Sequence, residues 1–372
     1  MVELAEIFRR YGPAYRARFG PHMLPSHHKA MRAIEQCRTP ALGGQVYECP
    51  DCGESRYLYH SCRNRHCPKC QNGNAQEWLE AQRDLLLPVP YFLLTFTLPA
   101  ELRTLARSNQ RLFYDLLFRT SAEAAQSLAR DPRFVGGQLG LVGVLHTWGR
   151  NLAYHPHVHY LVPAGGVASD GETWLPARGA NFLLPVKALS RIFRARFRDA
   201  LRDTPHFAHL PAGVWQQEWV VHCQPVGNGL NALKYLAPYI FRVAISNRRI
   251  LKVEDGRVTF RYRASDTGTL RTCTLPAEEF IRRFLQHVLP KGFVKVRYYG
   301  FFSPGLRQRL AAIRRQLDAA APTPDASHPA SSAEAAGAPP ALTSPQSFVR
   351  CPACGQAMCP RPLAHPERGQ PP

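Results

Sequence analysis

Two histidines separated by one hydrophobic residue, His157 and His159, offer the most specific metal chemistry in the sequence. Alternate side chains of a β-strand share a face, so an extended HPHVHYLVP run places His155 on that face as well. Neutral imidazoles gathered there can bind a divalent cation. His146 would reach the same ion if residues 149–154 turned the chain into a hairpin, with His155 as its rival. Histidines of this kind also occur as hydrogen-bonded core groups, so the interpretation needs support from elsewhere in the chain.

A pair of tyrosines, Tyr235 and Tyr239, offers a nucleophile. At positions i and i+4 of a helix both hydroxyls point the same way, and a phenol can attack phosphorus when nearby cations favour its ionised form. Pro238 between them favours a kink or a helix end, which leaves open whether both tyrosines reach one site. Packing of both rings into a core is the alternative. The cations close in sequence are Lys234, Arg242, Arg248 and Arg249.

Two Cys-x-x-Cys pairs, Cys49 with Cys52 and Cys67 with Cys70, have 14 residues between them. This spacing is typical of a zinc ribbon in which four thiolates bind one structural Zn²⁺. Neighbouring side chains could replace a ligand or build a second site, and the spacing does not choose among them. These further candidates are Cys37, Cys62, His60 and His66.

The C-terminal region holds a smaller group of cysteines, Cys351, Cys354 and Cys359, with His365 as a candidate fourth ligand. An Ala-, Pro- and Ser-rich stretch over residues 318–346 precedes it. Such a composition cannot bury a core, so we expect a disordered linker there and an isolated cluster beyond it.

The charge of the chain favours a polyanionic partner. Forty-seven Lys and Arg residues against 27 Asp and Glu residues give a formal net charge of +20, which attracts nucleic acid, or alternatively an anionic membrane surface. We expect no signal peptide and no membrane span, and hence a cytoplasmic, nucleoid-associated protein in which clustered cysteines bind metal. The candidate DNA-binding residues are Arg63, Arg65, Lys69, Arg191, Arg194, Arg198, Arg248 and Arg249.

The elements that must position these residues mix α and β structure. Residues 1–35 and 100–130 have helical periodicity, and residues 183–203 form a basic amphipathic helix. Residues 91–99, 139–149 and 155–166 are rich in β-branched and aromatic residues and predict strands. Asp255-Gly256 predicts a hairpin turn.

Together these segments resemble the HUH-type two-tyrosine transposases of the insertion-sequence ninety-one family. The resemblance rests on YHSCRNRHCPKCQ, FTLP, LHTWGRNLAYHPHVHYLVPAGG, YLAPYIFRVAISNRRI and HVLPKGFVKVRYYGFF. It implies an α+β fold whose HUH endonuclease domain has a central antiparallel sheet flanked by helices, preceded by a small zinc-ribbon-like domain and followed by a disordered tail. The implied divisions are a zinc-binding domain (1–88), an endonuclease domain (89–317), the linker (318–346) and a cysteine-containing tail (347–372).

The resemblance also implies a chemistry. His157 and His159 match metal ligands for Mg²⁺ or Mn²⁺, Tyr235 and Tyr239 match nucleophiles, and His146 fits as third ligand by analogy with relaxases. The expected function is rolling-circle transposition through a 5′-phosphotyrosine intermediate, on single-stranded or hairpin element ends, with a host helicase and replication machinery and without a membrane or small-molecule substrate. A rolling-circle replication initiator and a non-catalytic zinc-ribbon DNA-binding protein are the alternatives.

Overall fold

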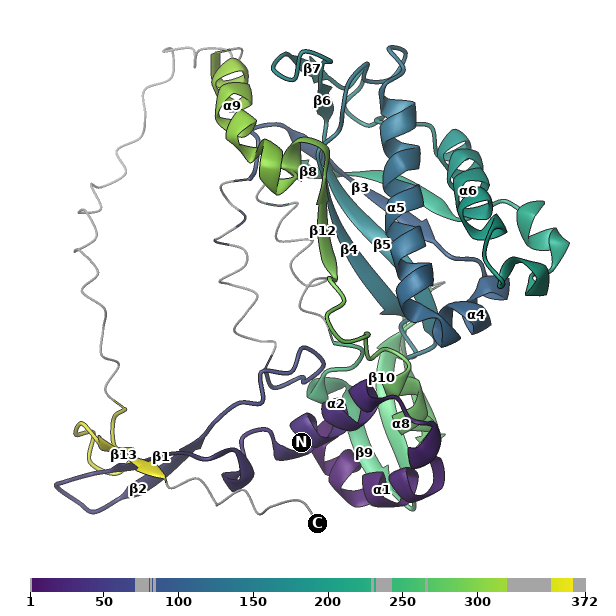
Figure 1. Ribbon diagram of the computed structural model, residues 1–372. Coiled ribbons are helices and arrows are strands. Elements are labelled where there is room, and N and C mark those ends of the chain that lie inside the picture. The colour runs from purple at the N-terminus through teal and green to yellow at the C-terminus, as the bar shows by residue number, and fades with distance from the viewer. Residues whose placement is uncertain are drawn as a thin grey trace. The chain divides into compact units, whose positions relative to one another are not determined.

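The computed structural model describes residues 2–70, 80, 82, 85–228, 231, 243–264, 267–319 and 349–363 (Figure 1). The chain forms two compact units. The large unit contains residues 1–35 and 63–319, and the small unit contains residues 36–62 and 320–372. This division differs from the predicted boundary at residue 88, because the small unit combines residues from both terminal parts of the chain. Nearly all of the predicted linker lies outside the described residues.

A five-stranded antiparallel sheet organises the large unit (Figure 1). Its strand order is β12-β4-β5-β3-β8. The predicted α+β fold with an antiparallel sheet flanked by helices is therefore confirmed, and the two histidine-bearing strands are central neighbours. The strands are β3 (Pro90–Thr97), β4 (Leu141–Trp148), β5 (Tyr154–Pro163), β8 (Val221–Asn228) and β12 (Val296–Tyr299).

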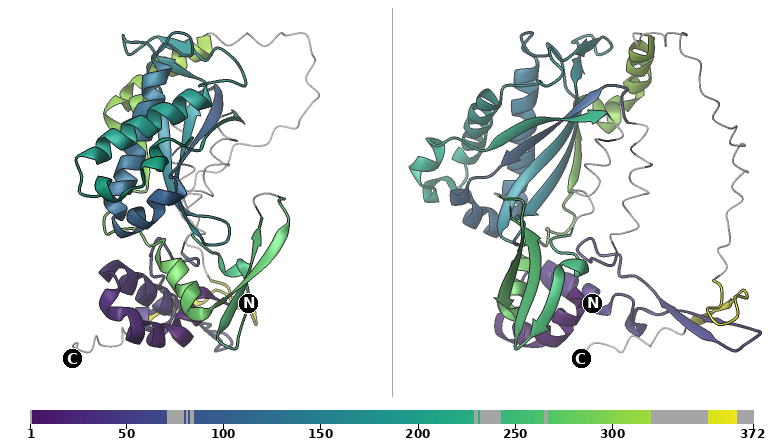
Figure 2. Two further views of the ribbon diagram at one scale, coloured as in Figure 1. Left: turned by 90° about the vertical axis from the view of Figure 1, so that its right-hand side faces the viewer. Right: turned by 180° about the vertical axis from the view of Figure 1, so that it is seen from behind.

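One face of this sheet packs against two long helices, α5 (Gln110–Ala129) and α6 (Val186–Arg202). Both helices lie on the same side of the sheet in Figure 2. Alternate residues of the strands, such as Phe96 and Tyr160, point into this layer, where the Phe96 ring centroid lies 5.2 Å from that of Phe193. The basic amphipathic helix predicted over residues 183–203 is therefore present, with its apolar face buried on the sheet.

A second apolar cluster covers one end of the opposite face of the sheet. Leu93, Val144 and Leu161 belong to this cluster, together with Phe301 from the 3-10 turn Gly300–Phe302 and Ile313 from α9 (Leu310–Ala319). The remaining end of this face carries the predicted histidines. Alternation along each strand thus places apolar and histidine side chains on one face but in separate places.

In the large unit the N-terminal helix packs against α8 (Ala277–Leu285), which in turn contacts a small β-region. Helix α1 (Leu4–Phe19) contacts α8 with the ring centroids of Phe8 and Phe284 5.3 Å apart. The β-region is the antiparallel sheet β9 (Ile250–Glu254), β10 (Arg257–Arg263) and β11 (Leu270–Pro276). Asp255 and Gly256 both have positive φ, as the predicted hairpin turn requires.

Other helices and strands in the described part of the large unit are α2 (Pro25–Gln36, whose last residue belongs to the small unit), α4 (Arg103–Ser108), β6 (Gly165–Val167) and β7 (Trp174–Pro176). Among the described residues, no helix is both long and apolar enough to cross a membrane.

The small unit contains a three-stranded antiparallel sheet with the order β13-β1-β2. Strands β1 (Gly44–Glu48) and β2 (Ser55–Tyr59) form a hairpin, and β13 (Cys359–Leu363) pairs with the other edge of β1. The C-terminal segment is therefore not an isolated cluster, because its strand pairs with β1, which directly precedes the first Cys-x-x-Cys pair.

Candidate functional site

The pairing of β4 with β5 brings three of the predicted histidines together. His146 lies opposite His157 in the register, and Val144 lies opposite His159. One ring nitrogen from each of His146, His157 and His159 lies within 4.8 Å of the other two. We call these three residues the histidine cluster. Imidazoles at such separations can share one cation.

Hydrogen bonds at the Nδ1 atoms orient two of these rings. His157 Nδ1 lies 2.6 Å from the carbonyl oxygen of His155, and since a carbonyl can only accept, Nδ1 carries the proton. His159 Nδ1 lies 2.9 Å from the hydroxyl of Thr95, which stands opposite it on β3. Each ring would therefore bind a cation through Nε2, with its orientation fixed by a neighbour, as is usual for metal-binding histidines.

Burial favours the neutral form of these imidazoles. It lowers the pKa of His157 to about 4 and lowers the pKa of His159 well below its usual value. A neutral imidazole is the form that binds a metal. The cluster is thus ready to bind a cation at neutral pH.

His155, the other candidate for third ligand, is engaged elsewhere. The guanidinium of Arg103, at the start of α4, donates to His155 Nδ1 at 2.9 Å. Burial and the charge of Arg103 lower the pKa of His155 to about 4. The structure groups His146, and not His155, with His157 and His159.

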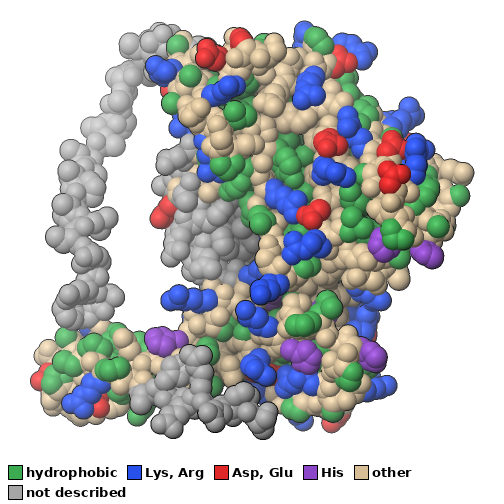
Figure 3. Space-filling view, in the orientation of Figure 1, with side chains coloured by type: hydrophobic (Ala, Val, Ile, Leu, Met, Phe, Trp, Pro, Cys, Tyr) green, Lys and Arg blue, Asp and Glu red, His purple; other side chains and the backbone are tan. Residues whose placement is uncertain are grey.

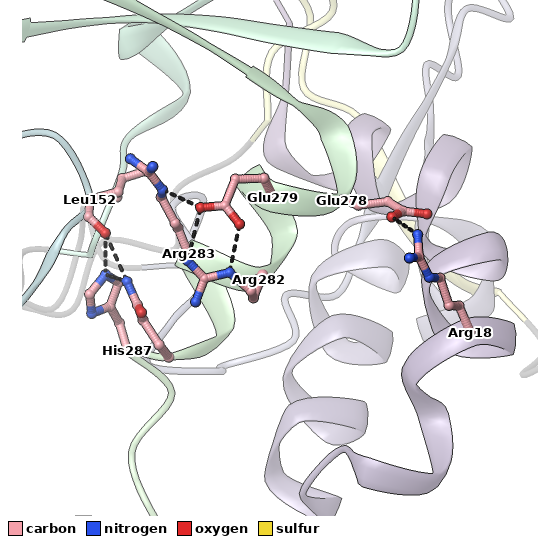
Figure 4. Close-up of polar contacts among 8 residues, drawn as sticks. Arg18, Leu152, Glu278, Glu279, Arg282, Arg283 and His287 are labelled. Atoms are coloured by element: carbon pink, nitrogen blue, oxygen red, sulfur yellow. Dashed lines mark hydrogen bonds and ion pairs between the residues drawn. The ribbon is translucent and has the colours of Figure 1, made fainter. Parts of the chain in front are cut away.

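The turn between the two histidine strands is fixed by residues that follow α8. Leu152 adopts a positive φ of 64°, and its carbonyl accepts hydrogen bonds from Gln286 Nε2 at 2.9 Å and His287 Nε2 at 3.2 Å (Figure 4). Nδ1 of His287 then accepts from the Thr147 hydroxyl at 3.2 Å. These contacts stabilise the hairpin on which the histidine cluster depends. Gln286 and Thr147 were not predicted from the sequence, because no sequence pattern marks them.

A cavity of about 520 Å³ opens beside the histidine cluster. Arginines from three segments line it, and its lining among the described residues contains no Asp or Glu. Lys and Arg side chains are also spread over the face drawn in Figure 3. An anionic ligand would therefore be attracted to the metal-binding residues. The arginines of the cavity are Arg150, Arg249, Arg261 and Arg263.

The predicted DNA-binding residues divide by what their side chains contact. Arg65 donates to the carbonyl oxygens of Phe293 (2.7 Å) and Pro290 (3.0 Å), and Lys69 pairs with Glu3 at 2.7 Å, so both have structural contacts. Arg249 lines the cavity and also donates to the Arg261 carbonyl at 3.0 Å. Arg63, Arg191 and Arg248 are exposed.

The arginines of α6 are not brought to the histidine cluster. The apolar side of this helix packs on the opposite face of the sheet. Arg194 bonds to the Gln217 carbonyl, and Arg198 pairs with Asp199 at 3.3 Å. The predicted nucleophiles, Tyr235 and Tyr239, lie outside the described residues.

The cysteines are grouped differently from the prediction. Cys49 and Cys52 lie with Cys351 and Cys354, and the four sulfur atoms are within 4.8 Å of one another. Since zinc takes four such ligands, this group leaves no position for Cys67 and Cys70, and the predicted set of four is not the one the structure assembles. We call the observed group the cysteine cluster.

The remaining cysteine candidates form pairs within each unit. The sulfur atoms of Cys67 and Cys70 are within 4.8 Å of each other in the large unit, and those of Cys37 and Cys62 are equally close in the small unit. His60 and His66 belong to no group of metal-binding residues among the described parts of the chain. His66 Nε2 instead accepts from the Leu289 amide at 3.3 Å.

Comparison with protein families identifies the class of protein. Residues 140–309 match a family described as "Putative transposase", and residues 7–98 match a "Transposase zinc-binding domain". The chain is a transposase, a DNA-processing enzyme of recombination, with a zinc-binding domain in its N-terminal part.

Two relatives place it more closely. "Putative transposase y4qJ" of Sinorhizobium fredii is 42% identical over 375 residues, covering 95% of this chain and 93% of the relative. The "Transposase for insertion sequence element IS801" of Pseudomonas savastanoi pv. phaseolicola is 32% identical over 310 residues, covering 77% and 73%. No solved structure matches significantly. The chain belongs to the IS91 family of insertion-sequence transposases.

Proposed function

We propose that this transposase cuts one DNA strand at the histidine cluster and holds the cut end on a tyrosine. The observation that carries the proposal is the grouping of His146, His157 and His159 on one face of the sheet, beside an arginine-lined cavity. Three protein ligands suit a catalytic cation, because they leave coordination positions for substrate. Mg²⁺ or Mn²⁺ held there would stabilise charge on the phosphate oxygens.

The proposed reaction conserves the energy of the phosphodiester. The hydroxyl of Tyr235 or Tyr239 loses its proton and its oxygen bonds to phosphorus, while the bond from phosphorus to the 3′ oxygen breaks and that oxygen gains a proton. The products are a 5′-phosphotyrosine and a free 3′-OH. A 3′-OH can later attack the phosphotyrosine and rejoin a strand, as rolling-circle transposition requires. Unwinding falls to a host helicase and the replication machinery, since the sequence has no GxxxxGK[ST] loop.

The arginines of the cavity would bind the phosphates on either side of the cut. Arg261 and Arg263 lie on β10 two residues apart, so both project from the same face of that strand. Guanidinium groups suit phosphate because their donors form a planar fork. A single strand or hairpin end of the element would lie along β10 and reach the histidine cluster.

The small unit offers a second surface for DNA. Tyr57 and Tyr59 stack at 6.2 Å on β2, and Tyr57 is 55% exposed. Arg38 lines the same cleft. Aromatic rings next to a cation are typical of surfaces that stack unpaired bases.

Incubation with single-stranded oligonucleotides covering the element ends tests the proposed reaction. With Mn²⁺, a denaturing gel should show a covalent adduct that carries the 5′ phosphate, and EDTA should abolish it. Tyr235→Phe and Tyr239→Phe assign the nucleophile. An adduct that persists in the double variant and in EDTA would refute both the tyrosines and the cation.

A further inference from the structure

The cysteine cluster is built from two copies of one local motif. Cys49-Pro-Asp-Cys52-Gly53 and Cys351-Pro-Ala-Cys354-Gly355 have the same Cys-Pro-x-Cys-Gly pattern. In the first, the Cys49 amide donates to Glu54 O at 2.9 Å and the Gly53 amide donates to Cys49 O at 3.0 Å. In the second, Cys351 donates to Gln356 O at 2.8 Å and Gly355 donates to Cys351 O at 2.9 Å.

Both glycines have positive φ, 71° for Gly53 and 78° for Gly355. A side chain at either position would strain this conformation. Each motif is therefore a preformed knuckle that turns two thiols toward one point, as zinc ribbons use them in pairs.

The pairing of strands brings the two knuckles face to face. β1 and β13 are antiparallel, with Gly44 opposite Leu363 and Glu48 opposite Cys359. Across the cluster, Cys49 Sγ lies 3.4 Å from Cys354 Sγ, and Cys52 Sγ lies 3.5 Å from Cys351 Sγ. Segments about 300 residues apart in sequence thus supply two thiols each.

The sulfur separations fit a shared metal ion and not disulfides. A disulfide requires about 2.05 Å between sulfur atoms, whereas four thiolates at about 2.3 Å from one zinc stand about 3.8 Å apart. All four cysteines are free. The observed values lie close to the metal arrangement.

The described residues of the small unit form only a small apolar core. Its buried apolar cluster consists of Cys49, Cys351 and Met358, with Tyr47 and Val349 packed against it. So small a core stabilises a fold only with a staple, such as a structural metal.

The structure assigns a four-thiolate zinc ribbon to the small unit. Residues 44–59 form its first half, and the C-terminal segment, residues 349–363, forms its second half. Cys351 and Cys354 are ligands of the same zinc ion as Cys49 and Cys52, although they lie outside both matched family regions. The tail is therefore an integral part of the zinc-binding unit.

Zinc content of the purified full-length protein tests this assignment. The double variant Cys351→Ser, Cys354→Ser should contain one zinc ion per chain fewer than the wild type. Cys359→Ser is the matched control, since Cys359 is an exposed cysteine of the same segment outside the cluster, and it should leave zinc unchanged. Equal zinc content in the double variant and the wild type would overturn the assignment.

A second measurement does not depend on whether the double variant folds, because it uses the wild-type cysteines. A protease site is inserted between residues 320 and 348 of the otherwise wild-type chain, and the folded protein is cut. The fragment that begins near residue 349 should co-elute with the rest of the protein until a strong chelator removes zinc. Release of the fragment without zinc loss, or its retention after complete zinc loss, would contradict the proposal that the zinc ion links it to the rest of the protein.

Discussion

The histidine cluster and the cysteine cluster gather metal-binding side chains in opposite ways. The histidines come from one hairpin within a large core, number three, and face a cavity lined with arginines. The cysteines come from segments far apart in sequence, number four, and belong to a unit with a very small core. A three-ligand site can accept substrate, whereas a four-thiolate site is closed. The chain therefore combines one site suited to chemistry with one suited to folding.

The largest expected effect is the loss of DNA cleavage when one imidazole of the histidine cluster is removed. His157→Ala or His159→Ala should lower oligonucleotide cleavage by about 1,000-fold or more, because a catalytic cation contributes several kcal/mol to the transition state. Zinc content and thermal stability should change little. Cleavage rate and metal analysis on the same sample provide the check, with the exposed His209→Ala as control. Cleavage within tenfold of wild type would remove the histidine cluster from the reaction.

Removing thiolates of the cysteine cluster should have the opposite effect, with zinc lost and cleavage retained. Cys49→Ser, Cys52→Ser should lose one zinc ion per chain and unfold the small unit, since structural zinc contributes directly to folding. The cleavage rate at saturating oligonucleotide should stay within about threefold, because the reacting groups that we propose belong to the large unit. Zinc analysis, circular dichroism and single-turnover kinetics measure the three quantities. A collapse of saturated cleavage would break the division between the two sites.

The cavity arginines should affect binding more than chemistry. Arg261→Ala, Arg263→Ala should weaken single-strand binding and reduce the slope of log K against log salt by about 1.4, or about 0.7 for each lost phosphate contact. Arg191→Ala serves as control, because α6 packs on the other face of the sheet. Fluorescence anisotropy over a range of salt concentrations gives the slope. An equal change in the control would mean that charge in general, and not the cavity, binds the strand.

The smallest expected effect concerns pH. Burial lowers the pKa of His157 to about 4 and also lowers that of His159. Both imidazoles therefore stay neutral as the pH falls from 7.5 to 6.0, and protons compete with a cation only nearer pH 4. The Mn²⁺ affinity, followed by electron paramagnetic resonance, should change less than about twofold across this interval. A steep loss with a midpoint near 6.5 would show ordinary, solvated histidines.

The sequence predicted the histidine cluster well because its geometry is local. Strand alternation places His157 and His159 on one face, and a short hairpin adds His146. These two local features are enough to predict the cluster. The choice of His146 over His155 depended on Arg103, which contacts His155 from another element. The positions of Arg103 and His155 in the sequence do not predict that contact.

The cysteine ligands and the roles of the cations could not be predicted in the same way. Three Cys-x-x-Cys pairs are chemically equivalent in sequence, and only the pairing of β13 with β1 selects Cys351 and Cys354 as partners of Cys49 and Cys52. Likewise, Arg65 resembles a phosphate-binding residue until the carbonyls of Phe293 and Pro290 are seen beside its guanidinium. Both outcomes depend on contacts distant in sequence.

The contrast between the two sites is tested most directly by the cleavage rate of protein dialysed against buffer free of Mg²⁺ and Mn²⁺, with zinc quantified in the same sample. Cleavage should disappear while the zinc content stays unchanged, and added Mn²⁺ or Mg²⁺ should restore cleavage. Full cleavage after dialysis, or recovery only when zinc is added, would contradict it.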